Sequence, residues 1–524
     1  MNAGRMIIFI VLVAILGVPF VMRPASDRRD LGVDVPTIVV VTPHVPQIRQ
    51  EFSEAFDRWH LRKYGSHVKI DWRQPGGTSE IMKQLEAQYH AAVGAGRVDF
   101  SDPKNPVVEA GTVSTDMMFG GGTYEHGRLK TGIRVKVAGK EMVLPLSTPI
   151  GFEQSRLDGW FGENKVGAGQ LYDPDQYWVG TALSGFGIVY NKELFREIYP
   201  GREDPYPKSF EDLADPALIG RVTLADPRQS GSVTTAFEGI LNFYGWERGW
   251  RLLREMCANT RSFTNSSPKT PLDVAQGEAA VGLSIDFYGR GQSQAIVIPG
   301  EALETSRVGY IDPKGSTYID ADPVSIMRGA PNFEVAKRFV EFTLTDEAQA
   351  LWQFYNVTSE RGAGNPRDES GELMGPRHAE LRRMPVRREM YAKYGSVMID
   401  KVEPFEVASN VKPAGWRSAL PLMMGVFAVD TAHEQRTAWG ALNRARGAAG
   451  FPAGVLAEME GLFYAWPMTV VEGREVPFTP ETYKAVRESW RAPGAQQRAE
   501  AAYLEFFRGN YERIVELERA NRPK

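Results

Sequence analysis

Residues 177–195, with the sequence YWVGTALSGFGIVYNKELF, constrain the fold more than any other stretch of the chain. The stretch begins as an extended run of aromatic and β-branched residues, which predicts a strand. Small residues at 184–187 break the run, which resumes at 188–190. Asn191 then ends the strand and caps a helix predicted over residues 192–198. A strand with small residues in its middle suits a segment that passes from one lobe to another. The sequence therefore predicts two α/β lobes, with a ligand cleft beside this strand.

The first part of the chain alternates between strand and helix patterns. Residues 37–41 read as a buried strand, a helix opens at Pro46, and residues 67–72 read as a second strand followed by a second helix. This order predicts a doubly wound sheet, in which ligands bind at the carboxyl ends of the strands. His44 and the turn at 76–79 therefore share one predicted rim of the sheet.

Turns rich in Ser, Thr and Gly occur at several predicted helix starts, at 76–79, 120–123 and 230–234. Helix N-termini offer free N–H donors and a positive dipole end, so they bind anions without basic side chains. We expect these turns, together with the first rim histidine, the crossing strand and the end of a later strand, to form the site. The predicted ligand-binding residues are His44, Gly76, Gly77, Thr78, Gly121, Gly122, Thr123, Ser184, Ser230, Gly231, Ser232, Asp286 and Tyr288.

Further patterns complete the predicted order of elements. Residues 132–146 alternate as a hairpin does, and capping boxes are predicted at 209–212 and 270–273. Residues 280–285 read as a buried strand that ends at 286–289. Residues 307–326 read as the return crossing between the lobes, followed by two helices. The last 165 or so residues are mostly helical patterns broken by prolines.

These patterns give an expected division of the chain. It comprises a signal anchor at 1–23, a linker at 24–35, lobe 1 at 36–180 with an insertion at about 126–176, and lobe 2 at 181–308. Residues 309–355 return to lobe 1, and 356–524 form a mainly helical C-terminal extension.

The N-terminus gives the clearest signal of compartment. Residues 6–22 are a nearly unbroken apolar run between Arg5 and Arg23, without small-residue cleavage chemistry and with no cysteine after it. The run is about the shortest length that spans a bilayer. We interpret it as an uncleaved anchor that tethers an exported, periplasmic body to the inner membrane, with a cleaved signal peptide as the alternative.

Composition and motifs exclude several functions. A net charge of −4 over 524 residues argues against a nucleic-acid partner. The single cysteine, Cys257, allows no internal disulfide and is interpreted as a small core residue. No nucleophile elbow, zinc-protease helix or P-loop lysine is present, so no enzyme is predicted. A carboxylate pair of Asp116 and Asp286 is the remaining catalytic option, but we interpret both as residues that orient loops or accept from backbone N–H groups. The basic run at 377–388 is interpreted as a solvated helix face or loop, with a contact to anionic lipid or an acidic partner as the alternative.

The order of motifs from 37 to 352 resembles the periplasmic solute-binding proteins of ABC importers, and is most similar to their ferric-iron-binding branch. The segments that carry the likeness are 177–195, 209–226, 227–231, 272–285 and 322–352. The resemblance implies two lobes of the type II, Venus-flytrap kind, joined by two crossing strands and closing on a ligand by hinge motion. It also implies delivery to a membrane permease without catalysis.

In the ferric branch, a histidine, a carboxylate and two adjacent tyrosines hold iron. His44 matches the histidine and Tyr288 one tyrosine, but Phe287 replaces the other, and glycines occupy the loop that should supply the carboxylate. Hard ferric iron favours anionic oxygen donors, which Phe287 lacks. In a strand, Asp286 would share a face with Tyr288 and substitute for the missing donor. The iron set would then be His44, Asp286 and Tyr288.

We therefore expect a membrane-anchored binding component of an ABC importer that captures a small organic anion, such as a phosphate or phosphonate ester. The alternatives are a ferric-iron-binding protein, a ligand sensor built on the same fold, and a cleft enzyme. The expected partners are the solute and the permease subunits. No cofactor and no nucleic acid are expected, and the protein is expected to be a monomer.

Overall fold

A computed structural model describes residues 35–298 and 301–523. The predicted anchor at 1–23 and nearly all of the linker lie outside the described residues. Within the described part of the chain, no helix combines the length and apolar character needed to cross a bilayer.

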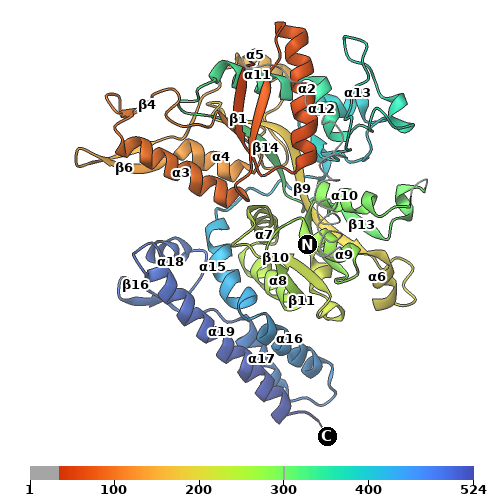
Figure 1. The fold of residues 1–524 in the computed structure, drawn as a ribbon. Coiled ribbons are helices and arrows are strands. Elements are labelled where there is room, and N and C mark those ends of the chain that lie inside the picture. The colour runs from red at the N-terminus through yellow and green to blue at the C-terminus, as the bar shows by residue number, and fades with distance from the viewer. Residues whose placement is uncertain (1–34, 299–300, 524) are drawn as a thin grey trace, which may run out of the picture.

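The first lobe is built on a sheet with three parallel strands. β1 (Thr37–Val41) pairs in parallel with β2 (Lys69–Arg73) and β5 (Met117–Phe119), and β14 (Ile319–Met327) runs antiparallel to β5. Helices α2 (Pro46–Tyr64) and α3 (Thr78–Gly94) follow β1 and β2, as predicted. Ile48, Phe52 and Trp59 of α2 are buried in the core of this lobe, which their helical spacing explains. Figure 1 shows the sheet between these helices.

The second lobe repeats the arrangement. β10 (Val222–Ala225) lies between β11 (Thr260–Thr264) and β12 (Val281–Ile285), all parallel. Helices α7 (Gly231–Tyr244), α8 (Trp246–Ala258) and α9 (Lys269–Ala275) pack against these strands. Cys257 is buried in the core of this lobe, as expected. The sequence patterns missed β11, because TRSFT carries no clear period.

The long strand β9 (Val179–Asn191) belongs to both lobes. Its first half pairs with β14 and its second half with β12 and β13 (Val308–Ile311). The predicted break at 184–187 is wrong, since the strand continues through it. The glycines there instead allow close approach of neighbouring atoms. A Cβ on Gly187 would lie 2.2 Å from the carbonyl oxygen of Ile311. Asn191 caps α6 (Lys192–Ile198) by accepting from two backbone N–H groups, as predicted.

The chain returns to the first lobe through residues 312–318 into β14, which confirms the predicted second crossing. The capping box at Ser209 is present. The box predicted at 270–273 is absent, because α9 begins at Lys269, two residues before the predicted first helical residue Pro271, and the Thr270 hydroxyl is buried without a partner. The strand predicted at 280–285 was expected to end in a loop at 286–289. Instead, α10 (Asp286–Ala295) begins directly after β12.

The inserted region between β5 and β9 contains short elements. The predicted hairpin is formed by β6 (Ile133–Val137) and β7 (Lys140–Leu144), with Ala138 and Gly139 at positive φ in its turn. The other elements described before β9 are β3 (Val98–Asp99), β4 (Val107–Val108), α4 (Thr123–Thr131), β8 (Ser147–Thr148) and α5 (Gln154–Phe161).

The C-terminal extension follows α11 (Phe333–Thr343) and α12 (Asp346–Gln353) and divides between the lobes. Its first half packs Leu381, Met384 and Val386 into the core of lobe 1, and β15 (Met384–Pro385) pairs with β9. Its second half joins the core of lobe 2. The described elements of the extension are α13 (Arg388–Tyr394), α14 (Pro404–Val407), α15 (Leu420–Met424), α16 (Ala432–Gly447), α17 (Ala453–Tyr464), β16 (Thr469–Val471), β17 (Arg474–Val476), α18 (Tyr483–Ser489) and α19 (Ala495–Ala520).

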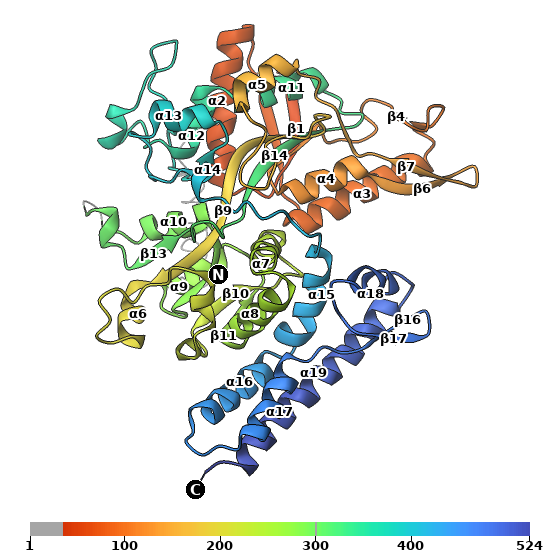
Figure 2. The same cartoon turned by 180° about the vertical axis from the view of Figure 1, so that it is seen from behind.

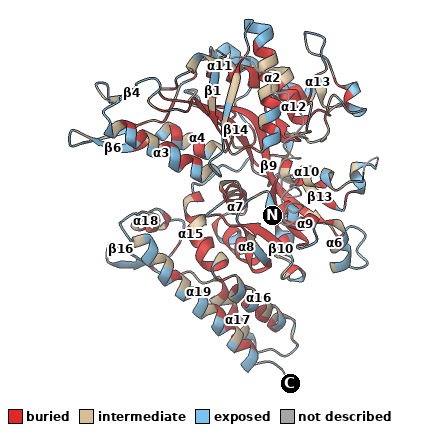
Figure 3. Cartoon of the chain, viewed as in Figure 1, coloured by how far each residue is buried: buried red, intermediate tan, exposed pale blue. Residues whose placement is uncertain are grey.

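Figure 2 shows how far the last helices project below the second lobe, and Figure 3 shows the buried residues concentrated along the shared sheet. The predicted two-lobed α/β fold with a helical C-terminal region is therefore confirmed. The extension differs from an appended domain, since its halves complete the cores of two different lobes.

Candidate solute site between the lobes

An arginine of the extension lies at the boundary between the two lobes. Arg383 is 3% exposed. Its Nη1 lies 2.6 Å from Oδ2 of Asp322 and 3.0 Å from Nε2 of His44. Its Nη2 donates to Oγ of Ser184 on β9. Its guanidinium carbon stands 4.5 Å from the ring centre of Phe287 in the second lobe. Arg383 therefore contacts both lobes and the strand that joins them.

His44 follows β1 on the predicted rim, and its imidazole is 5% exposed. Nε2 lies 2.8 Å from Oδ2 of Asp322. Burial lowers the pKa of the ring, since the opposing effect of Asp322 is the smaller one, so neutral imidazole is favoured. A Cβ on Gly120 would lie 2.4 Å from Nε2. Glycine at this position thus allows the backbone to pass against the ring.

Asp322 is the anionic centre of this cluster. Burial alone favours the protonated carboxyl, but Arg383 and His44 together hold the pKa of Asp322 below its usual value. Its Oδ1 accepts from the backbone N–H of Gly121 at 2.9 Å. The carboxylate therefore joins β14, the first rim loop and the extension.

Asp286 and Tyr288 lie on the first turn of α10 rather than at a strand end. The strand alternation expected to bring them to one face therefore does not apply. Burial raises the pKa of Asp286 to about 7, opposed by Arg290, and raises the pKa of Tyr288 to about 12. The charge of Arg383 lowers the pKa of both groups. Arg383 thus lies within electrostatic reach of both residues.

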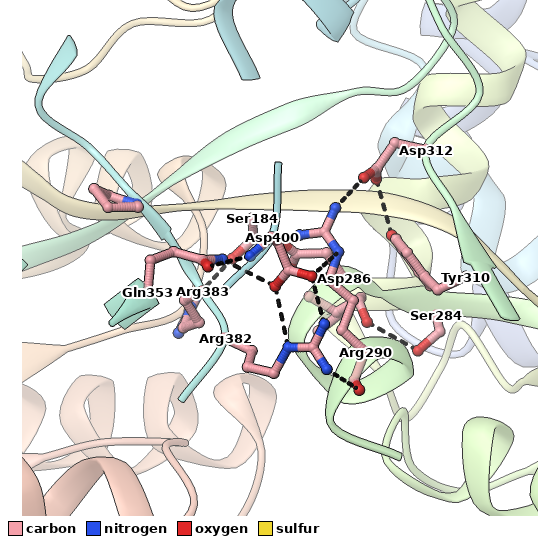
Figure 4. A network of polar contacts seen from close by, with 12 residues as sticks. Ser184, Ser284, Asp286, Arg290, Tyr310, Asp312, Gln353, Arg382, Arg383 and Asp400 are labelled. Atoms are coloured by element: carbon pink, nitrogen blue, oxygen red, sulfur yellow. Dashed lines mark hydrogen bonds and ion pairs between the residues drawn. The ribbon is translucent and has the colours of Figure 1, made fainter. Parts of the chain in front are cut away.

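A second ionic network lies beside this cluster, and Figure 4 shows it. Nη2 of Arg290 lies 2.5 Å from Oδ2 of Asp312, and Nε lies 3.8 Å from Asp400 of the extension. Asp400 also pairs with Arg382 and accepts from Gln353 of the first lobe at 3.1 Å. The network therefore ties the second lobe to the extension and to the first lobe.

The glycine-rich turn before α4 differs from its expected role. The backbone N–H of Gly121 donates to Asp322, that of Gly122 to Glu125, and that of Thr123 to Asp320. The chain's own carboxylates therefore occupy the amides that were expected to hold a solute anion.

The other two predicted turns meet across the boundary between the lobes. A Cβ on Gly231 would lie 2.7 Å from Oγ1 of Thr78, and one on Gly77 would lie 3.9 Å from the carbonyl oxygen of Gln229. The Ser230 hydroxyl caps α7 and contacts Ser267. These turns bring the two lobes together. Gly76 and Ser232, the remaining predicted ligand-binding residues, lie in these two turns and are half-buried.

A second arginine of the extension bridges the lobes at these turns. Arg417 donates to Oγ1 of Thr235 at 2.7 Å and to the carbonyl oxygen of Gly231 at 2.9 Å, both in the second lobe. Its guanidinium lies 3.6 Å from Glu125 and stacks 4.4 Å above the ring of Tyr124, both in the first lobe.

Sequence reasoning missed Arg383, Arg417, Asp320 and Asp322. The basic run at 377–388 was noticed in the sequence, but its interpretation as a solvated helix face or loop is wrong for three of its arginines. Arg382, Arg383 and Arg387 are buried and pair with Asp400, Asp322 and Asp346. Their acidic partners lie elsewhere in the sequence, so the run itself does not show that it is buried.

The predicted iron set is not assembled as a metal site. Among residues 35–298 and 301–523, no group of three or more His, Cys, Asp or Glu side chains is placed to hold a metal ion. His44 instead contacts the guanidinium of Arg383, and the Asp286 carboxyl lies 3.4 Å from Arg290. Fixed cations therefore adjoin two of the predicted ligands.

Two α/β lobes joined by β9 and by the return segment 312–318, with a polar cluster at their boundary, are the arrangement that the resemblance implied. Residues 163–372 match the family of bacterial extracellular solute-binding proteins, which confirms the predicted resemblance. The family description is that of a binding protein rather than an enzyme, in agreement with the prediction.

Individual relatives are similar over shorter stretches. An uncharacterized protein of Haemophilus influenzae is 31% identical over 170 residues, 32% of this chain and 45% of that protein. Iron uptake protein A1 of Synechocystis is 27% identical over 217 residues, 39% and 56% of the two chains. Phosphoglycerate transport regulatory protein PgtC of Salmonella typhimurium is 23% identical over 193 residues, 36% and 45%. The chain spans about half the length of these curated relatives.

Among solved structures, iron-bound HitA from Pseudomonas aeruginosa is 16% identical with a TM-score of 0.48. The alignment covers 74% of this chain and 99% of that one.

Proposed function

We propose that this chain is the exported solute-binding component of an ABC importer, and that it captures a small organic anion between its lobes. One observation carries the choice of an anion. The cationic or neutral side chains His44, Arg49 and Arg383 each contain a buried nitrogen without a hydrogen-bond partner in the described structure: Nδ1, Nε and Nε. Nη1 of Arg383 lies 3.0 Å from Nε2 of His44, and the charges of both arginines lower the pKa of that ring.

The chemistry of these donors suits an anion of the phosphate or phosphonate ester class. Guanidinium groups bind such oxygens through directed N–H bonds. His44 has two options at Nε2, donating to Asp322 or accepting from Arg383. Nδ1 has no partner in the described structure, so an anion beside it accepts from Nδ1 when that nitrogen carries a proton. Arg49 lies in the first turn of α2, whose positive dipole end adds to the attraction.

Entry of the solute requires the lobes to separate, since His44 and Arg383 are both buried here. The strand β9 and the return segment 312–318 would act as the hinge. Delivery to permease subunits in the inner membrane and a monomeric state complete the proposal. The apolar run at 6–22 supports tethering, which fractionation of the host membrane with and without these residues would test.

Iron capture is the second candidate, and the similarity to a protein named for iron uptake favours it. Arg383 weighs against it, because a fixed cation beside His44 repels a trivalent metal. A sensor role is a third candidate, since another relative is named a transport regulatory protein. An adjacent permease gene would support import, and an adjacent sensor kinase gene would support sensing.

The test is a calorimetric titration of the whole exported body with 3-phosphoglycerate, fructose 6-phosphate and ferric citrate, together with native mass spectrometry of protein from its own host. We expect a phosphate ester to bind, and Arg383→Gln to weaken it about tenfold or more, as loss of a charged hydrogen bond does. Exposed Arg388→Gln is the matched control. Tight binding of ferric ion that survives Arg383→Gln would contradict the proposal.

A further inference from the structure

Arg254 on α8 is a buried cation without a carboxylate partner. It is 1% exposed. Its Nη1 donates to the carbonyl oxygen of Phe463 at 2.6 Å and its Nη2 to that of Ala465 at 2.8 Å, at the end of α17. Within residues 35–298 and 301–523, no carboxylate forms an ion pair with it. In the part of the chain that the structure describes, carbonyl dipoles therefore supply its directed polar contacts.

Aromatic rings surround the rest of this guanidinium. Its central carbon lies 4.0 Å from the ring centre of Trp466 and 5.0 Å from that of Phe507. Ring faces attract a cation, but they carry only partial negative charge. Burial lowers the pKa of Arg254 to about 10, which reflects the missing counter-ion. A buried charge is normally paired, so this group lacks an anion.

The two preceding arginines on the same helix show the contrast. Arg248 pairs with Glu211 and Glu255, and Arg251 pairs with Glu255. Both are exposed to solvent and would tolerate an incomplete partner more easily than Arg254 does. The acidic residues thus neutralise the exposed arginines and leave the buried one without compensation.

A cavity of about 350 Å³ adjoins this cation, at the small end of the roughly 300–1,000 Å³ range of small-molecule sites. Its lining residues are Trp246, Glu247, Arg248, Trp250, Arg251, Arg254, Tyr464 and Trp466. Two buried N–H groups in this wall have no partner, Nε1 of Trp250 and Nε of Arg254. The two residues are four apart on α8, so they stand on one helix face, and both contact Trp466.

We infer that this cavity binds a small planar carboxylate. The two carboxylate oxygens accept from Trp250 and Arg254, and the charge compensates the guanidinium. The flat body of the ligand packs against the indole rings of Trp246 and Trp466. A monoanion matches the charge of Arg254, since Arg248 and Arg251 have carboxylate partners, and a planar group matches the four aromatic rings in the wall. This site lies between the second lobe and the extension, apart from the boundary that the proposed transport site occupies.

Benzoate is the probe, with neutral benzamide as its matched control. Both are titrated into the whole exported body, and binding is measured by calorimetry and by tryptophan fluorescence. We expect benzoate to bind and benzamide to bind at least about tenfold more weakly, because only benzoate supplies the charge. Saturating 3-phosphoglycerate should leave benzoate binding unchanged, which separates this cavity from the transport site.

Trp250→Phe keeps the ring and removes only the N–H group. It should weaken benzoate about tenfold while leaving the ligand-free unfolding midpoint unchanged or raised, since no hydrogen bond is lost. Trp246→Phe, in the same wall, should bind benzoate within about twofold of the parent. Absence of benzoate binding, equal binding of benzamide, or full affinity in Trp250→Phe would each overturn the inference.

Discussion

Arg383 and Asp322 form an ion pair inside the protein, with Nη1 and Oδ2 2.6 Å apart and side chains 4% and 2% exposed. One residue comes from the extension and the other from β14. Removing one partner would leave the other charge buried and unpaired, which costs about 3–5 kcal/mol. We therefore expect Arg383→Leu to be strongly destabilising, and Arg383→Leu with Asp322→Leu to recover part of the loss.

Urea unfolding of the two single variants and the double variant measures this coupling. The exposed pair Arg134 and Glu141, 3.4 Å apart, is the matched control, and its coupling should stay below about 1 kcal/mol. Equal coupling in the two pairs would show that the Arg383–Asp322 contact is absent in solution.

Because of Asp286, the free energy of unfolding should fall as pH rises from about 4 to 7. Its pKa is raised from 3.8 to about 7 by burial, so the folded protein keeps a proton that the unfolded chain releases. The contribution is greatest below the unfolded pKa and is lost as pH rises toward 7. A tenfold difference in proton affinity between the folded and unfolded states corresponds to about 1.4 kcal/mol of stability.

Asp286→Asn carries no such proton, so the stability difference between variant and parent should change between about pH 4 and pH 7. Urea midpoints measured at intervals across this range provide the test. A constant difference would mean that Asp286 titrates normally in the folded protein.

Gly187 on β9 should not tolerate a side chain. Its added Cβ would lie 2.2 Å from the carbonyl oxygen of Ile311, a backbone atom that cannot rotate away. We expect Gly187→Ala to cost about 2 kcal/mol or more, as overpacking does. Gly159→Ala in α5, where nothing lies within 4 Å, should instead stabilise by roughly 0.5–1 kcal/mol. Thermal unfolding distinguishes the two, and similar midpoints would contradict the packing around β9.

Arg417 should hold the lobes together. Its contacts with Thr235 and Gly231 fix it to the second lobe, and its contacts with Glu125 and Tyr124 reach the first. Arg417→Ala removes the bridge, so amide hydrogen exchange should rise in α4 and in the first turn of α7.

Lys412→Ala, an exposed change in the same segment, should leave exchange at both helix starts unchanged. If amide hydrogen exchange in Arg417→Ala rose only around α15, the arginine would stabilise the extension alone. Small-angle scattering of both variants would report any change in lobe separation.

Local patterns predicted much of the fold. β1, α2, β2 and α3 follow from buried β-branched runs and helical spacing, and these cues act over a few residues. The continuation of β9 through 184–187 was missed, because the small residues fit the close approach of Ile311 rather than a bend. α10 was missed because a helix that starts directly after a strand leaves no turn in the sequence.

The site was predicted less well. His44 and Ser184 were found because strand order and the crossing strand place them at the boundary. Arg383 was missed, since a run of arginines is usually solvated and only the distant partner Asp322 makes burial possible. Amides at Gly121 and Thr123 were expected to be free, but carboxylates on β14 occupy them.

The contact between His44 and Arg383 joins residues 339 positions apart. During synthesis, the first lobe is therefore made long before the arginine that completes its polar cluster. Closing so large a loop costs little more free energy than closing a moderate one, but contacts between distant positions slow folding. Until Arg383 arrives, Asp322 lacks its cation. The polar cluster at the boundary between the lobes is therefore complete once the extension has packed beside β9.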